Sequence, residues 1–336
     1  MMKEHDATTQ LIETICSAKA RNARLRIRGG DSKGFLGLSK VGESLDSRNH
    51  NGILELDPAQ FWIRARAGTS LRALNATLDE YELMLAFEPP AFSADATVGG
   101  MVATGLAGPR RPWAGGVAEH VLGGSLIDGD GQLRHFGGEG IPSRLVAGSL
   151  GRLGLISEVC LLVRQKPRRT LSLRLEISQS LALRQFRTWM RYPSPLSGVC
   201  HTGDALYLRL EGTPEAVQRA RSLIGGDETS SSLWDDLREQ RLGFFRDPRP
   251  LWCIQVGADA PQRELPGAVL LDWGGAQRWL KSAEPTLVIE RHAQALGGRA
   301  ICFTPDGCAP GLSQLPEAED MRALRKQLDP QGLFAG

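Results

Sequence analysis

Arg28-Gly29-Gly30-Asp31-Ser32-Lys33 directly follows Arg24-Leu25-Arg26-Ile27-Arg28, in which polar and apolar residues alternate. Such alternation is typical of a half-buried strand. Glycines placed directly after a strand let successive backbone N–H groups converge on one point, and this geometry suits a pyrophosphate. Ser32 adds a hydroxyl donor and Lys33 a positive charge. The hexapeptide alone fits a plain tight turn equally well.

Two further segments are rich in small residues. Thr97-Val98-Gly99-Gly100-Met101-Val102-Ala103-Thr104-Gly105 follows the breaker Glu88-Pro89-Pro90, and small residues allow close approach of the backbone to a flat ligand or another strand. Gly148-Ser149-Leu150-Gly151-Arg152-Leu153-Gly154 precedes a strand, whereas the nicotinamide-type G-x-G-x-x-G follows a strand and opens a helix. A Rossmann fold is therefore disfavoured, and the first of these two segments taken alone also fits a buried packing loop.

A fourth segment, Gly108-Pro109-Arg110-Arg111-Pro112-Trp113-Ala114-Gly115, holds two arginines between prolines. Prolines restrict the backbone, so these side chains have less entropy to lose on binding. The pair suits neutralisation of a diphosphate or docking of a partner. Taken alone, two solvated arginines on a rigid loop are the simpler interpretation.

Bulk properties narrow the class of protein. A chain of 336 residues predicts two domains, and 40 basic against 38 acidic side chains argue against binding to nucleic acid. The six cysteines form no C-x-x-C pair and the six histidines are dispersed, so no metal site is expected. The polar start, Met1 to Gln10, and the absence of a long apolar stretch predict a cytoplasmic protein, with attachment to the inner membrane through partners left open.

The pattern of elements changes near Lys166-Pro167-Arg168-Arg169. Before it, the sequence predicts a helix over Ser70–Tyr81 and a hairpin around Asp128-Gly129-Asp130-Gly131. After it, strands and helices alternate, at Leu171–Ile177, Leu181–Met190, Ala205–Glu211 and Pro214–Ile224. We therefore predict an α+β protein, with residues 1–165 forming one domain and residues 166–336 a smaller ferredoxin-like α/β domain.

The order and spacing of the segments are more specific than any one of them. R-G-G-x-S-K, E-P-P, T-V-G-G-x-x-A-T-G, G-P-R-R-P-W-A-G and A-G-S-L-G-x-L-G together resemble the PCMH-type FAD-binding domain of vanillyl-alcohol-oxidase-type flavoproteins. Within that group, Phe87–Pro90 and Gly105–Gly115 resemble the E subunits of bacterial glycolate oxidases, as do Leu271–Trp279 and the closing Leu328–Phe334. The resemblance covers nearly the whole chain.

The resemblance implies a two-subdomain fold that holds FAD extended between α/β subdomains. Relatives that attach flavin covalently often carry a histidine in the first loop, and because none is present here, FAD is expected to be non-covalent. The smaller domain is expected to cap the cofactor and contact other subunits. The residues that the resemblance assigns to the cofactor are Arg28, Gly29, Gly30, Asp31, Ser32, Lys33, Pro90, Thr97, Val98, Gly99, Gly100, Thr104, Gly105, Gly108, Arg110, Arg111, Gly148, Ser149 and Gly154.

The same resemblance implies a heteromeric complex with a larger FAD-containing catalytic subunit and an iron–sulfur subunit, which oxidises glycolate, a small 2-hydroxy acid, to glyoxylate. No catalytic base is identifiable in this chain. Asp31 stands where the family prefers glycine, and only Glu139 to Val146 connects Gly138 to Ala147, where relatives carry a longer segment. These departures favour an alternative, a non-redox assembly subunit with a degenerate flavin pocket. A stand-alone oxidase of another 2-hydroxy acid is a third and less favoured hypothesis.

Overall fold

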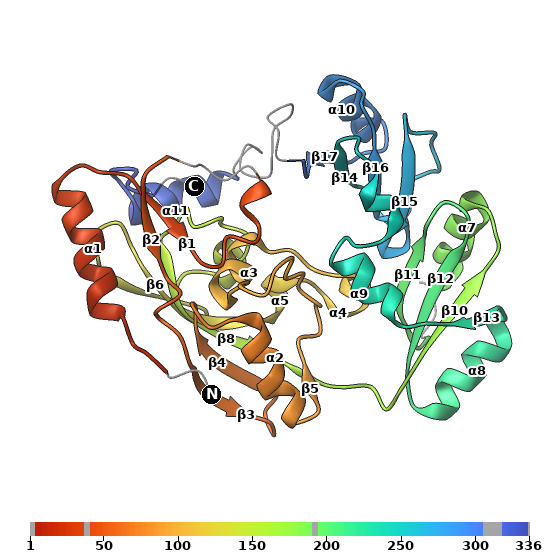
Figure 1. Ribbon diagram of the computed structural model, residues 1–336, viewed down its shortest axis with the longest axis horizontal. Coiled ribbons are helices and arrows are strands. Elements are labelled where there is room, and N and C mark those ends of the chain that lie inside the picture. The colour runs from red at the N-terminus through yellow and green to blue at the C-terminus, as the bar shows by residue number, and fades with distance from the viewer. Residues whose placement is uncertain (1–3, 37–40, 190–193, 305–317, 335–336) are drawn as a thin grey trace. The chain divides into compact units, whose positions relative to one another are not determined.

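A computed structural model describes residues 4–36, 41–189, 194–304 and 318–334 (Figure 1). The chain divides into two compact units. The first unit comprises Met1–Ala107, Gly115–Lys166 and Ser313–Gly336, and the second comprises Gly108–Ala114 and Pro167–Leu312. A single boundary at residue 165/166 differs from this division at two segments, because the arginine loop belongs to the second unit and the C-terminal segment to the first.

The first unit is built on an antiparallel five-stranded sheet of order β3-β4-β8-β6-β7. Its strands are β3 (Ile53–Asp57), β4 (Trp62–Arg66), β6 (Val121–Ile127), β7 (Leu133–Phe136) and β8 (Leu155–Leu162). The helices of this unit that contribute to the same core are α2 (Leu71–Glu80), α3 (Val98–Thr104), α5 (Val117–His120), α6 (Ser143–Val146) and α11 (Glu319–Leu328).

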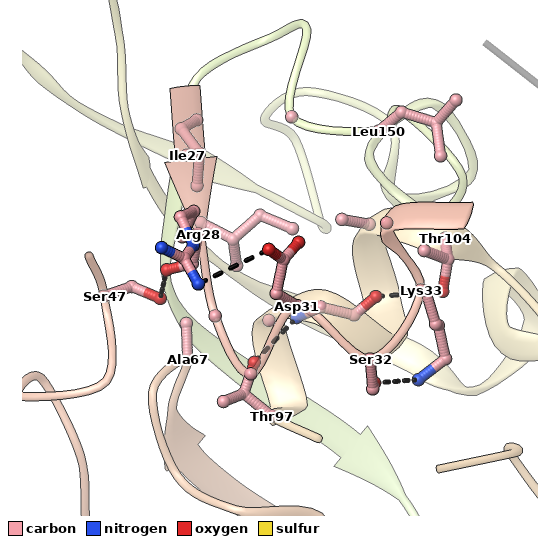
Figure 2. A pocket seen from close by; sticks show the side chains of 18 of the residues that line it. Ile27, Arg28, Asp31, Ser32, Lys33, Ser47, Ala67, Thr97, Thr104 and Leu150 are labelled. Carbon is pink, nitrogen blue, oxygen red and sulfur yellow. Dashed lines mark hydrogen bonds and ion pairs between the residues drawn. The ribbon is translucent and has the colours of Figure 1, made fainter. Parts of the chain in front are cut away.

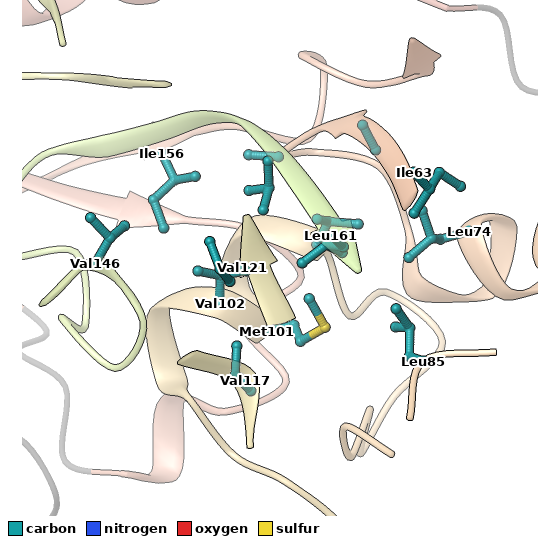
Figure 3. Close-up of a cluster of buried hydrophobic side chains, with 14 of the residues drawn as sticks. Ile63, Leu74, Leu85, Met101, Val102, Val117, Val121, Val146, Ile156 and Leu161 are labelled. Carbon is teal, nitrogen blue, oxygen red and sulfur yellow. The ribbon is translucent and has the colours of Figure 1, made fainter. Parts of the chain in front are cut away.

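Apolar side chains from these strands and helices meet in one buried cluster, which Figure 3 shows in part. Ile63 and Leu161 from the sheet are fully buried, as are Leu74 from α2 and Val102 from α3. Helix α2 begins where Ser70 accepts a hydrogen bond from the backbone N–H of Ala73, the usual role of serine at a helix start. The core therefore fixes α3 against the sheet.

A smaller layer of the first unit carries strand β1 (Leu25–Arg28), which pairs in parallel with β2 (Glu43–Asp46). On its other side β1 forms a bridge to Phe334, and the N–H of Leu25 donates to the carbonyl of Leu333 at 2.8 Å. Helix α1 (Thr8–Ala20) packs into the same apolar cluster as Leu25 and Phe334. Short elements complete the unit: β5 (Leu83–Met84), β9 (Arg164–Gln165) and the 3-10 turn η1 (Gly34–Leu36).

The second unit begins with a β-α-β-β-α-β motif: β10 (Arg169–Leu175), α7 (Gln179–Trp189), β11 (Leu196–His201), β12 (Leu206–Gly212), α8 (Pro214–Ile224) and β13 (Asp227–Thr229). The strand order β13-β10-β12-β11 is entirely antiparallel, and both helices share one apolar cluster with the strands. This is the ferredoxin-like arrangement, so that prediction is confirmed. The predicted helix end Met190 lies outside the described residues.

The same sheet continues through a second set of strands. They are β14 (Leu251–Gln255), β15 (Ala268–Asp272), β16 (Gln277–Lys281) and β17 (Arg299–Cys302), with helix α10 (Thr286–Gln294) before β17. Their order β15-β16-β14-β17 repeats the order of the first motif in reverse, and the two motifs join through one residue pair, His201 with Leu271. Helices α4 (Arg111–Ala114) and α9 (Ser232–Arg238) and turns η2 (Gly243–Arg246) and η3 (Trp273–Gly275) complete the unit.

The chain is thus a mixed α and β protein of two units. Within the described ranges, no helix is long and apolar enough to cross a membrane.

Candidate functional site

A cleft in the first unit lies where β1 ends (Figure 2). It holds about 730 Å³ of space, a volume that includes part of the open solvent. Three segments line it: the loop after β1, helix α3 with its preceding residue, and the loop before β8. The lining residues are Ile27, Arg28, Gly29, Gly30, Asp31, Ser32, Lys33, Gly34, Ser47, Ala67, Thr97, Gly99, Gly100, Ala103, Thr104, Leu150, Gly151, Gly154 and Ile156.

The two glycines after β1 allow the loop to pass directly against the segment that precedes α3. A Cβ atom at Gly30 would lie 1.7 Å from the carbonyl oxygen of Asp95, and one at Gly29 would lie 2.3 Å from Thr97 Oγ1. At Gly30 the neighbour is backbone, so a side chain there would require the backbone to shift, whereas a side chain at Gly29 would displace the Thr97 side chain. The first loop is therefore held at the cleft by close packing that glycine permits.

The backbone N–H groups of this loop are open to a ligand. In the described part of the chain, no acceptor takes the N–H of Gly29, Gly30, Asp31 or Ser32. Asp31 adopts a left-handed backbone conformation with φ of 54°, which turns consecutive N–H groups toward one side. An acceptor rich in oxygen, such as a phosphate, is the natural partner for such a group of donors.

The left-handed conformation also explains why glycine is the expected residue at position 31, and why aspartate is among the few tolerated replacements. The Asp31 carboxylate turns toward Arg28, with 3.4 Å between Oδ2 and Nη2 (Figure 2). A carboxylate beside a diphosphate lowers affinity unless a cation neutralises it. Because Arg28 supplies that cation, Asp31 does not by itself argue against anion binding.

Lys33 brings a positive charge to the cleft from a largely buried position, with 6% of its surface exposed. Its Nζ lies 3.4 Å from Ser32 Oγ (Figure 2) and 3.5 Å from the carbonyl oxygen of Ala91. It also lies 5.8 Å from the centroid of the Phe92 ring. Burial reduces screening by solvent, so this ammonium group attracts an anion more strongly than an exposed lysine does.

Helix α3 lines the cleft without offering the donors of its first turn. The N–H of Val98 donates to the carbonyl of Thr69, and the N–H of Gly99 to the carbonyl of Ala67. The N–H of Gly100 donates to the side chain of Thr97, which caps the helix. The donors available to an anion in this cleft therefore come from the first loop rather than from the helix terminus.

The third segment reaches the cleft despite the short connection before it. Helix α6 occupies Ser143–Val146, and the chain then docks on α3: the N–H of Gly148 donates to Val102 O at 2.9 Å and that of Leu150 to Ala103 O at 2.8 Å. A Cβ atom at Gly105 would lie 3.1 Å from the Cα of Gly148, so the two backbones pack closely. Leu150, Gly151 and Gly154 thereby form one wall of the cleft.

The structure brings together these residues that the sequence assigned to the cofactor: Arg28, Gly29, Gly30, Asp31, Ser32, Lys33, Thr97, Gly99, Gly100, Thr104 and Gly154. Others support the cleft without lining it: Pro90, Val98, Gly105, Gly148 and Ser149. Val98, for example, points into the apolar core. Sequence reasoning missed Ser47 and Ala67, which enter the lining from the ends of β2 and β4 and carry no motif.

Gly108, Arg110 and Arg111 do not line the cleft but pack within the second unit. The carbonyl of Gly108 accepts a hydrogen bond from Trp273 Nε1 at 3.0 Å. Arg110 donates from Nε and Nη2 to the Glu211 carboxylate at 3.1 and 2.6 Å, and both side chains are over nine-tenths buried. Arg110 thus fastens its loop to strand β12.

No group of three or more His, Cys, Asp or Glu side chains that could hold a metal ion occurs among the residues described.

Comparison with known proteins shows the family to which the chain belongs. The chain is 44% identical to the glycolate oxidase subunit GlcE of Escherichia coli (strain K12) over 342 aligned positions, which cover 99% of this chain and 97% of that protein. The chain belongs to the GlcE family of glycolate oxidase subunits. The resemblance seen in the motifs is confirmed, and it holds along nearly the whole length of the GlcE chain.

More distant similarities cover part of the chain or show the fold alone. The FAD binding domain family matches residues 5–137. The D-2-hydroxyglutarate dehydrogenase of Pseudomonas putida is 36% identical over 124 positions, which cover 35% of this chain and 12% of that protein. A solved structure of alkyldihydroxyacetonephosphate synthase superposes with a TM-score of 0.68 at 14% identity, covering 98% of this chain and 75% of that one, and shows a shared fold.

Proposed function

We propose that this GlcE-family chain is the FAD-binding subunit of a complex that oxidises a small 2-hydroxy acid, with glycolate as the substrate and glyoxylate as the product. The observation that carries the proposal is the loop after β1. It directs unpaired backbone N–H groups into a cleft that also receives the cations of Arg28 and Lys33. A doubly charged diphosphate matches this set of donors and charges.

The residues present fit FAD in its extended form. The N–H groups of Gly29 to Ser32, the Ser32 hydroxyl and the Lys33 ammonium would hold the diphosphate. Gly99, Gly100 and Gly154 line the cleft and would lie beside the cofactor. Bound FAD would supply an acceptor for the two electrons removed from the substrate. The chain itself contributes binding, orientation and exclusion of water.

We further propose that the chemistry on the substrate is shared with partner subunits. The larger FAD-containing subunit and the iron–sulfur subunit expected from the sequence are the candidates. For its location we propose the cytoplasm, with attachment to the inner membrane through a partner. Purification of the tagged chain from fractionated cells would test both points, because the fraction that contains the chain gives its location and the proteins that co-purify with it are its partners. Absence of the partner subunits from every fraction would contradict the shared complex.

The visible spectrum of the purified chain, before and after incubation with FAD, tests the central proposal. We expect flavin bands that disappear from the protein on denaturation and reappear in the supernatant, since no covalent attachment is expected. FMN should bind more weakly than FAD and ADP should compete with FAD, because the loop recognises a diphosphate.

Other results would select the other hypotheses. A folded chain that binds no flavin at high FAD but still binds its partners would be an assembly subunit with a degenerate pocket. Oxidation of a 2-hydroxy acid by the isolated chain would identify a stand-alone oxidase. Equal affinity for FAD and FMN would contradict the assignment of the diphosphate to the loop after β1.

A further inference from the structure

His50 lies directly behind the cleft, in the loop between β2 and β3, and its side chain is fully buried. Its Nδ1 accepts a hydrogen bond from the backbone N–H of Ala7 at 3.1 Å, and its Nε2 lies 3.0 Å from Ser157 Oγ. Because an amide N–H can only donate, Nδ1 carries no proton. The imidazole is therefore neutral, and its Nε2–H donates to the Ser157 hydroxyl.

The backbone of His50 fixes one part of the cleft wall. Its N–H donates to the carbonyl of Ser47 at 2.9 Å, and its own carbonyl accepts the N–H of Gly68 at 2.9 Å. Ser47 lines the cleft, and its hydroxyl donates to the carbonyl of Arg28 at 3.0 Å (Figure 2). A Cβ atom at Gly68 would lie 2.1 Å from the Ser47 carbonyl oxygen, so these backbones pack closely. A displacement of His50 would therefore move Ser47 and the end of β1.

The side chain of His50 supports a second part of the wall through Ser157. The carbonyl of Ser157 accepts the N–H of Ala67 at 2.7 Å, and the carbonyl of Ala67 accepts the N–H of Gly99 at 2.8 Å. Ala67 and Gly99 both line the cleft, as does Ile156, the neighbour of Ser157. One neutral imidazole thus holds the segment before α1 together with two segments of the cleft wall.

Protonation of His50 is incompatible with this arrangement. It would place an Nδ1–H opposite the N–H of Ala7, so that two donors face each other in a site without exposure to solvent. The carboxylate of Asp6 offers an alternative acceptor, with 3.6 Å between Oδ1 and Nδ1. A charged imidazole would therefore exchange Ala7 for Asp6, and the ring would leave the position that supports the wall.

The charged and titratable groups that face His50 come from two segments. The N-terminal segment presents Asp6 and His5, and β4 presents Arg66, whose Nη2 donates to Asp6 Oδ2 at 3.1 Å. Strand β8 presents the neutral hydroxyl of Ser157. Burial lowers the pKa of His50 below its usual value of 6.5, Asp6 raises this pKa and Arg66 lowers it. Because burial is the largest of these effects, the neutral form is present above pH 6.5 and is lost as the pH falls through the lowered pKa.

We propose that His50 is a proton-sensitive positioning residue of the cleft. The neutral side chain holds Ser47 and Ala67 in the arrangement that binds the ligand, and the protonated side chain loosens both. Affinity for the ligand therefore falls on acidification. The choice of FAD as the ligand rests on the proposed function, whereas the coupling of His50 to the cleft wall rests on the hydrogen bonds around it.

The test is titration of the full-length, flavin-free chain with FAD between pH 8 and pH 5.5, followed by flavin fluorescence. The diphosphate of FAD keeps its charge over this range. The dissociation constant of the wild-type chain should rise about two- to tenfold from pH 7.5 to pH 5.5, since one group with a pKa at or below about 6.5 changes it by at most about tenfold. In H50Q, whose side chain does not titrate, it should change less than twofold. H135Q is the matched control and should behave as the wild type does, because His135 is exposed on β7 and does not line the cleft.

Two further measurements make the test independent of the fold of H50Q and of FAD binding. Asp6→Asn removes the alternative acceptor at a position that is 54% exposed, so protonation of His50 becomes less favourable and the rise of the dissociation constant should shift to lower pH. Hydrogen exchange of the flavin-free chain, corrected for its intrinsic pH dependence, should show loss of protection at the amides of Ala7, Ala67 and Gly68 at pH 5.5. These amides should stay protected in H50Q.

Three results would overturn the proposal: a change of less than twofold in the wild-type dissociation constant, an equal pH dependence in H50Q, or unchanged protection of the three amides at pH 5.5. The same samples separate this test from that of the proposed function. A chain that binds no FAD at pH 8, but loses amide protection on acidification as described, would refute the flavin assignment alone. FAD binding of equal affinity at pH 8 and pH 5.5 would refute the role of His50 alone.

Discussion

Replacement of Lys33 by methionine removes one of the two cations at the cleft while keeping a long side chain of similar length. Lys33 is 6% exposed, so solvent screens its charge little. Its Nζ donates hydrogen bonds to Ser32 Oγ at 3.4 Å and to the Ala91 carbonyl at 3.5 Å. A hydrogen bond to a charged group contributes about 1.5–3 kcal/mol. We therefore expect the dissociation constant for FAD to rise about 10- to 150-fold in K33M.

The assay is titration of the flavin-free chain with FAD, followed by the change in flavin fluorescence, at low and at physiological ionic strength. Lys19→Met is the matched control. Lys19 lies in the same unit, forms an ion pair with Asp130 at 2.6 Å, and does not line the cleft. The K19M chain should bind FAD as the wild type does. If K33M bound FAD within twofold of wild type, or if K19M lost as much affinity, the diphosphate would not be held as we infer.

Three further perturbations test other features. Glu211→Gln removes the buried carboxylate that pairs with Arg110 and with Arg209, so the free energy of unfolding by urea should fall by about 3–5 kcal/mol. A loss below about 1 kcal/mol would show that these ion pairs are not buried in solution. Burial lowers the pKa of His50 below its usual value of about 6.5. As the pH falls, the unfolded chain therefore binds a proton at this histidine before the folded chain does. The free energy of unfolding should then decrease below pH 6.5, by up to about 1.4 kcal/mol per pH unit. H50Q should show a flatter profile of unfolding free energy between pH 7.5 and 5.5, and an unchanged slope would assign the effect to other groups. D31G should tighten FAD binding a few-fold at low salt because one negative charge leaves the first loop, an effect that added salt should reduce; weaker binding would mean that the Arg28–Asp31 pair orders the loop.

Elements with local signals could be predicted from the sequence. Helix α8 covers the predicted range, because Pro214 stands at its first position and Thr213 caps it by accepting the N–H of Ala216. The hairpin of β6 and β7 turns at the predicted D-G-D-G segment. The first loop could be recognised as part of a site because its glycines and its polar residues are adjacent in the sequence.

Structural features that depend on contacts between residues far apart in the sequence could not be predicted. Strand β11 was missed because all six of its residues are buried in the middle of the eight-stranded sheet, so it lacks the alternation of a half-exposed strand. The sequence does not show that Arg110 pairs with Glu211 or that Arg111 lies over Trp273, and the assignment of these arginines to the cofactor stays a prediction. Only the folded chain shows that a segment from the first half of the sequence completes the second unit.

The bridge between Leu25 and Phe334 affects when β1 can acquire all of its neighbours during synthesis of the chain. Strand β1, whose loop forms the floor of the cleft, is flanked on one side by β2 and on the other by residues near the opposite end of the sequence. During translation, β2 leaves the ribosome soon after β1, whereas Leu333 and Phe334 leave it only after the whole second unit has been synthesised. A nascent chain arrested after residue 166 would therefore contain every residue that lines the cleft, but β1 would lack the segment that flanks its second side.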